Sequence, residues 1–257
     1  MTASVRRVHA LVKSISGMPS LFRGLLTLCA ANFATHFLRV IFAAPLSLIY
    51  LDPLASIPAH LALVQLHTVW VHVVITPPNP LPFWKRLPPF GKTFRATVRP
   101  IMLYALAKEI ARGVPTLIVV LVNGGRDMKL SVFPFFALGI FAFYLVLWFF
   151  VELPAQIALV RIQASLLPPE EYPIVPFDRS FGGRVNSPFT VGGDADGKDD
   201  KTHATLRDIW ETLTKTAMYR VGRLVLKVLA INLGIGMAFG AVVCLTAVVA
   251  NVPLTRP

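Results

Sequence analysis

The longest uncharged apolar stretch of the chain covers residues 130–151. At about 1.5 Å per helical residue, a stretch of this length crosses a hydrocarbon layer of about 30 Å. Lipid offers no hydrogen-bond partner to backbone N–H and C=O groups, so the segment must be helical if it lies in a membrane. The pattern therefore predicts a transmembrane helix, which we name span D.

Four further apolar segments are separated from one another by polar turns or basic loops. They predict span A within residues 25–50, span B within 57–76, span C within 102–122 and span E within 228–249. Together the five segments predict an all-α polytopic membrane helix bundle with about five transmembrane helices.

The apolar spans and the polar segments between them divide the chain into four regions. Residues 1–23 form a basic N-terminal segment, and 24–167 form a membrane region with spans A to D. Residues 168–205 are a polar loop rich in Pro, Gly and Asp. Residues 206–257 contain the final span, and the apolar positions in 206–227 follow the spacing of an amphipathic helix that leads into it.

Composition supports the membrane assignment and suggests an orientation. The chain has 257 residues, of which 55% are hydrophobic and only 15% charged, and its formal net charge is +12. With the N-terminus in the cytoplasm, 18 of the 25 Lys and Arg residues face that side and three face the other. This bias favours a lipid bilayer over nucleic acid as the partner of the basic residues, and it predicts an opposite side for the C-terminus.

Localisation has one alternative, which comes from the N-terminal segment. Residues 1–51 hold no acid until the turn at Asp52 and carry scattered Arg, Lys, Ser and Thr. A mitochondrial transit segment has this bias, and a cytoplasmic basic tail before a first span needs the same residues. The organelle therefore stays open, with the mitochondrial inner membrane as the alternative.

Ionisable residues in or beside the spans form the candidate polar site. Such residues are costly in a bilayer unless they pair or serve a pathway. Glu109 and Arg112 lie three residues apart on one helical face, so they can neutralise each other while Lys108 extends toward the interface. Arg39 and Glu152 are candidate partners from other spans.

Neither a metal centre nor an enzyme active site is predicted. His60, His67 and His72 share span B, and the first two share a face, but no acid or cysteine accompanies them there. Cys29 and Cys244 lie in apolar spans, where a thiolate is disfavoured. We expect no catalytic residue, no metal and no cofactor.

Gly236 and Gly240 form a G-x-x-x-G element in span E, which allows another helix to approach closely. We favour packing within one chain, because small residues line most membrane helix contacts, with contact with a second copy or another membrane protein as the alternative.

An internal repeat connects spans B and D. PAHLALVQLHT at Pro58 recurs at Pro154 as PAQIALVRIQA, with five of eleven positions identical. Transporters often contain duplicated helical units, so the match predicts a degenerate two-helix repeat. We expect Pro58 to be tolerated at a helix start, whereas a helix passing Pro154 should bend and carry Arg161 and Gln163 to the interface.

The second copy resembles the mitochondrial carrier signature P-x-[DE]-x-x-[KR]-x-[KR]-x-Q, with Pro154, Arg161 and Gln163 at matching positions. Gln156 replaces the acid of that signature and Leu159 its first base, so the charged gate that the resemblance implies cannot form. Those proteins also have three repeats, and this chain has two at most.

A second resemblance rests on LLPPEEYPIVPFDRSFGG and on the Pro-rich segment before Trp84. These stretches are similar to an uncharacterised family of multispanning membrane proteins in filamentous fungi. Its members sometimes carry the label "ubiquitin carrier protein", for which this sequence offers no accessible reactive thiol.

Two functions follow as hypotheses. The first is a non-enzymatic structural or assembly role in the membrane, and the alternative is transport of a small solute or ion. If Arg39, Glu109, Arg112 and Glu152 converge on a water-accessible cavity, transport is favoured; a solidly packed bundle favours the structural role.

Overall fold

Every regular element in the described part of the chain is helical. The computed structural model describes residues 10–11, 13–14, 17, 22–48, 52–123, 133–168, 170–175, 177 and 204–250. No strand occurs among them. The all-α class predicted from the apolar pattern is therefore confirmed for these residues.

In the described part of the chain, three helices are long and apolar enough to cross a membrane, or four if a bent pair counts as one span. The three are α2 (Leu25–Ser47), the continuous helix Phe135–Ser165 and α9 (Lys215–Ala250). The bent pair is α3 (Ser56–Ala62) with α4 (Val64–Ile75), which meet at an angle of 65°. The residues predicted as span B thus form two helices, because the backbone leaves helical geometry at Leu63 (φ −102°, ψ 20°).

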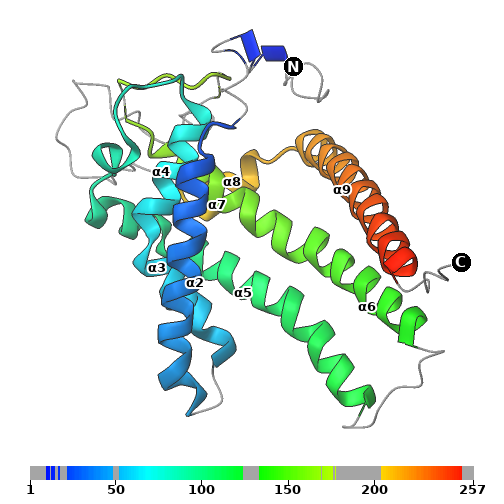
Figure 1. Cartoon of the computed structure of the whole chain (residues 1–257). Coiled ribbons are helices and arrows are strands. Elements are labelled where there is room, and N and C mark those ends of the chain that lie inside the picture. Colours follow the sequence, from blue (N-terminus) through cyan, green and yellow to red (C-terminus); the bar gives the residue numbers. More distant parts are fainter. Residues whose placement is uncertain are drawn as a thin grey trace, which may run out of the picture. The chain divides into compact units, whose positions relative to one another are not determined.

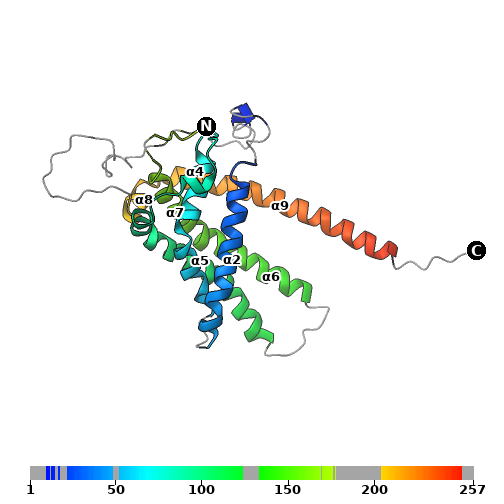
Figure 2. The same cartoon turned by 60° about the vertical axis from the view of Figure 1, so that its left-hand side comes forward.

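Helix α5 (Phe90–Asn123) contains the residues predicted as span C. Its 34 residues are long enough to cross a bilayer, but it carries too many charged side chains to count among the apolar helices just described. Within the described chain it runs antiparallel to the helix Phe135–Ser165 and packs against it (Figures 1 and 2).

The chain divides into two compact units, Val12–Thr212 and Met1–Leu11 with Leu213–Pro257. In the first unit the core lies where α3, α4 and the N-terminal half of α5 meet α7 (Leu153–Ser165). Val64, Ile101 and Leu159 pack together there. Small side chains at Ala59 and Ala105, both fully buried, allow the helix backbones to approach closely.

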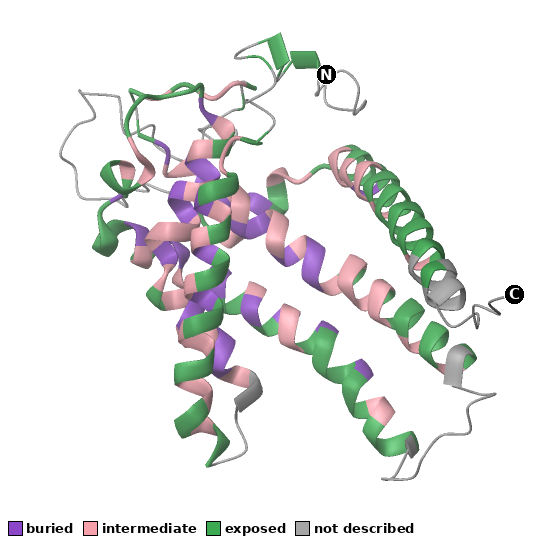
Figure 3. Ribbon diagram, in the orientation of Figure 1, coloured by how far each residue is buried: buried purple, intermediate pink, exposed green. Residues whose placement is uncertain are grey.

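Large apolar side chains are exposed along the distal parts of α5 and of α6 (Phe133–Leu147), shown in green in Figure 3. The exposed fraction is 70% at Leu121, 77% at Phe135 and 65% at Leu138. A soluble protein rarely leaves so much contiguous apolar surface open. Lipid is the solvent that suits these helix faces.

Both repeat prolines stand in the first turn of a helix. Pro58 lies in α3 directly after the 3-10 turn η2 (Asp52–Ala55), as expected for a tolerated position. Pro154 lies at the start of α7, after the π-helical turn η4 (Trp148–Glu152). The wider turn accommodates the proline, which cannot donate a backbone hydrogen bond, and the helix Phe135–Ser165 continues through it.

Gln163 is buried in the protein, at 2% exposed, and its position at a membrane interface stays a prediction. The two repeat segments also differ in their backbone structure. The first breaks at Leu63, whereas the equivalent Leu159 lies inside the unbroken α7.

The amphipathic helix expected over residues 206–227 is interrupted. Helix α8 (Leu206–Thr212) ends before α9 begins at Lys215. The Thr214 hydroxyl accepts a hydrogen bond of 3.2 Å from the Ala217 N–H, which is an N-cap interaction at the start of α9. Capping by Thr214 therefore explains why a new helix starts here.

Candidate functional site

The five predicted intramembrane charges lie on neighbouring segments of the first unit. Arg39 comes from α2, Glu152 from η4, and Lys108, Glu109 and Arg112 from α5. The Arg39 Nη2 and Glu109 Oε2 atoms are 3.9 Å apart, which is an ion pair between α2 and α5. The pairing of Glu109 with Arg112 expected from their spacing is not what forms in the described residues, because Glu109 pairs across to Arg39.

Lys108 and Glu152 complete this charged cluster. The Lys108 Nζ atom lies over the Tyr104 ring, 5.5 Å from its centroid, as in a cation–π contact. Glu152 is 6% exposed and its Oε2 atom has no hydrogen-bond partner. The charges of Lys108, Arg112 and Glu109 are near enough to act on the Glu152 carboxylate. The cluster therefore joins three elements that are far apart in the sequence.

A cavity of about 140 Å³ lies beside this cluster. Its wall comes from α2, α3, α4, α5 and α7 and contains the apolar residues Leu28, Ile101, Leu159 and Val160. Its polar lining consists of Asn32, His60, His67, Trp70, Tyr104, Lys108, Gln156 and Gln163. Of the five charged candidates, only Lys108 lines the cavity.

Two histidines that the sequence placed on one face of span B stack in the cavity wall. The His60 and His67 ring centroids are 5.4 Å apart and the rings are nearly parallel, at 14°. His60 Nδ1 donates to the Ser56 carbonyl at 2.7 Å. A neutral imidazole that donates with one nitrogen keeps a hydrogen-bond acceptor on the other, so His60 Nε2 is an acceptor. The same holds for His67 if one of its nitrogens donates.

The contacts of Thr35 fix the donor role of His67. The Thr35 hydroxyl donates its one proton to the Ala31 carbonyl at 2.7 Å. The same oxygen lies 3.0 Å from His67 Nε2, so this nitrogen carries the proton and donates. Among the described residues there is no group of three His, Cys, Asp or Glu side chains that could hold a metal ion.

The repeat accounts for half of the polar cavity wall. Aligning Pro58 with Pro154 matches His60 with Gln156 and His67 with Gln163. All four side chains line the cavity. The sequence marked these positions as repeat mates, but their convergence on one cavity requires the packing of α3 and α4 against α7 and could not be predicted from the repeat alone.

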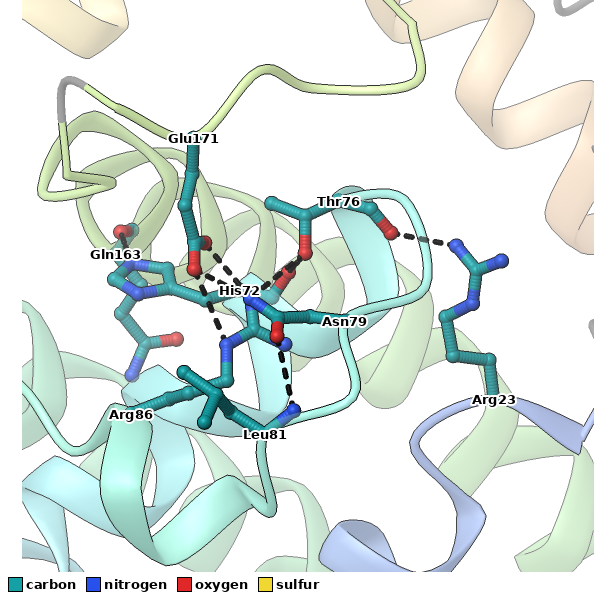
Figure 4. Close-up of polar contacts among 8 residues, drawn as sticks. All are labelled: Arg23, His72, Thr76, Asn79, Leu81, Arg86, Gln163 and Glu171. Carbon is teal, nitrogen blue, oxygen red and sulfur yellow. Dashed lines mark hydrogen bonds and ion pairs between the residues drawn. The ribbon is translucent and has the colours of Figure 1, made fainter.

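Gln163 connects the cavity with a second polar group at the end of α4. Its Nε2 atom is buried without a hydrogen-bond partner. Its backbone carbonyl accepts a hydrogen bond of 2.9 Å from His72 Nε2 (Figure 4). Burying the Gln163 side-chain amide without a hydrogen-bond partner costs free energy in the folded protein.

The second polar group is a contact that we name the Arg86 clasp, formed by Arg86, Glu171 and Thr76. Arg86 Nη2 lies 2.8 and 2.7 Å from the two Glu171 carboxylate oxygens and 3.0 Å from the Thr76 hydroxyl (Figure 4). Arg86 belongs to the 3-10 turn η3 (Phe83–Arg86). The clasp ties the loop after α4 to the segment after α7.

Two further bonds support this end of the unit. The Arg23 guanidinium donates to the Thr76 carbonyl at 2.5 Å, and burial lowers the pKa of Arg23 from its ordinary value. The Ile174 N–H donates to the Ile75 carbonyl at 2.8 Å. Sequence reasoning missed the clasp, although Glu170 and Glu171 form a rare acidic pair in a basic region.

The remaining predicted residues lie outside these sites. Gly236 and Gly240 lie on α9, and a Cβ added at either glycine would meet no neighbouring described atom within 4 Å. Cys29 is a free thiol on α2, whereas the Cys244 side chain lies outside the described residues. The helix-packing role of the two glycines stays a prediction.

Comparison with known proteins found no family model, no curated protein and no solved structure that matches this chain.

Proposed function

We propose that this chain is an integral membrane protein of the transport class that binds a small polar solute in the cavity between α2 and α7. The carrying observation is the polar wall built from the repeat mates His60, His67, Gln156 and Gln163. Solute sites of transporters commonly lie at the interface between structural repeats. Polar side chains are expensive inside a bilayer, so their convergence on an open volume supports a functional role.

The proposal includes five crossings, with α5 as the fifth beside α2, the α3–α4 pair, the helix Phe135–Ser165 and α9. The N-terminus lies in the cytoplasm and the C-terminus opposite, as the distribution of basic residues favours. In this arrangement the charges of α5 face partners on α2 and η4, which lowers the cost of placing them in the membrane.

The alternative is a non-enzymatic structural or assembly role, through contacts with a second copy or another membrane protein at Gly236 and Gly240. One observation favours it: Arg39, Glu109, Arg112 and Glu152 do not line the cavity. The Arg39–Glu109 pair links α2 to α5, as a structural contact would.

Cysteine labelling distinguishes the two functions. In a chain with Cys29→Ser and Cys244→Ser, Gln156→Cys places a thiol in the cavity wall, and Ile157→Cys places one on the adjacent, partly buried position. Transport predicts that a small hydrophilic thiol reagent labels Q156C in membranes far faster than I157C. Equal, slow labelling of both variants would favour the structural role.

A further inference from the structure

The described residues of the cavity wall carry a positive formal charge and no negative one. Lys108 contributes an ammonium group, and no Asp or Glu lies among the described residues that line the cavity. The side-chain amides of Asn32, Gln156 and Gln163 and the indole N–H of Trp70 add neutral donors. A ligand that accepts several hydrogen bonds and carries negative charge matches this wall.

The charged cluster beside the cavity also has a net positive charge. Arg39, Lys108 and Arg112 contribute three positive charges, against two negative charges from Glu109 and Glu152. An excess positive charge in a medium of low dielectric constant is costly unless an anion compensates it. Lys108 is the member of the cluster that lines the cavity, so a bound anion would be placed where it can compensate the excess.

Unused hydrogen-bonding groups narrow the choice of anion. The buried Gln163 Nε2 atom is a donor without a partner. His60 and His67 each keep an acceptor nitrogen after their bonds to Ser56 and Thr35. A hydroxyl group next to a carboxylate would satisfy an acceptor of this kind while the carboxylate accepts from the donors.

The volume sets the size of the ligand. A cavity of about 140 Å³ corresponds to roughly five water molecules in the liquid, at about 30 Å³ each. The volume is therefore sufficient for a short carboxylate with four or five non-hydrogen atoms.

We propose that the cavity binds a short carboxylate, with a hydroxycarboxylate preferred, and that Lys108 is its principal binding residue. This inference rests on the proposed transport function, because it identifies the class of solute for the same cavity.

The test uses protection of the Q156C thiol in the full-length chain. Sodium glycolate, sodium acetate and ethanolamine hydrochloride are titrated against the labelling rate, with sodium chloride to keep the ionic strength constant. We expect saturable protection by glycolate, weaker protection by acetate and none by ethanolamine.

Three variants locate the effect. Lys108→Gln should weaken the apparent affinity for glycolate roughly ten- to hundredfold, as expected for loss of a charge-assisted hydrogen bond. Lys108→Arg keeps the charge and should retain most of the protection. Lys92→Gln removes the same charge from an exposed position of α5 and should leave protection unchanged.

The outcomes separate this inference from the proposed function. Labelling of Q156C without protection by either carboxylate, or with protection by ethanolamine, would overturn the carboxylate assignment and leave a water-accessible cavity in place. Absence of labelling would overturn both. Protection that survives in K108Q would overturn the role of Lys108.

Discussion

Lys108 and Arg86 are cations in one compact unit with different surroundings. Arg86 has an 8% exposed side chain and contacts both oxygens of Glu171. Lys108 makes no ion pair with a described residue and lines a cavity. A bidentate pair such as that of Arg86 fixes geometry, whereas an ammonium group without a carboxylate partner remains able to bind a ligand.

Glu171→Gln should destabilise the protein, because it leaves the buried Arg86 guanidinium without a counter-charge. Breaking a buried pair on one side costs about 3 kcal/mol. Thermal unfolding in detergent should show a lower Tm for this variant. The neighbouring Glu170 is exposed, so Glu170→Gln is the matched control, and equal effects of the two substitutions would show that the clasp contributes nothing specific.

Individual helices follow from local sequence to different degrees. The apolar runs of α2 and of residues 130–151 predict their helices directly, because few charged side chains interrupt them. No proline or glycine stands at Leu63 to predict the helix break there. The π-helical turn before Pro154 depends on how the helix adjusts to a proline that has no backbone N–H to donate. Such details depend on packing, which a periodicity argument does not contain.

Thr214→Ala should loosen the first turn of α9. Loss of an N-cap costs about 1 kcal/mol, so the amides near Ala217 should exchange with solvent several-fold faster. Hydrogen exchange measured by mass spectrometry on the full chain can resolve this segment. Thr216→Ala lies inside the same turn and serves as the control; unchanged exchange in T214A would contradict the assignment of the cap.

Ile101→Ala should weaken the packing between α4, α5 and α7. Ile101 is 1% exposed and contacts the cluster with Val64 and Leu159. Truncating a buried Ile costs about 2 kcal/mol or more through the void that remains. Unfolding in detergent measures the loss, and Met102→Ala, at a position that is 48% exposed, should have a much smaller effect. Similar losses for both would contradict the core described here.

For the whole molecule, the sequence predicted the class of architecture better than the site. The all-α class and the long apolar helices follow from composition and apolar run length, which are local properties. Arg39 was a candidate partner for the charges of span C, and its guanidinium does pair with Glu109 across helices. The cavity combines residues from five helices, so its existence depends on tertiary packing. His60 and His67 were not predicted as metal ligands, and only the structure shows that their repeat mates share the same wall.

The central claim is that the cavity lies within the membrane, which requires α5 to cross it despite its charges. Single cysteines at Pro80→Cys, before α5, and Asp127→Cys, after it, report this directly in a chain without native thiols. An impermeant maleimide applied to sealed, oriented vesicles should label only one of them, and permeabilisation should expose the other. Labelling of both positions from the same side would show that α5 does not cross, and would contradict the intramembrane cavity.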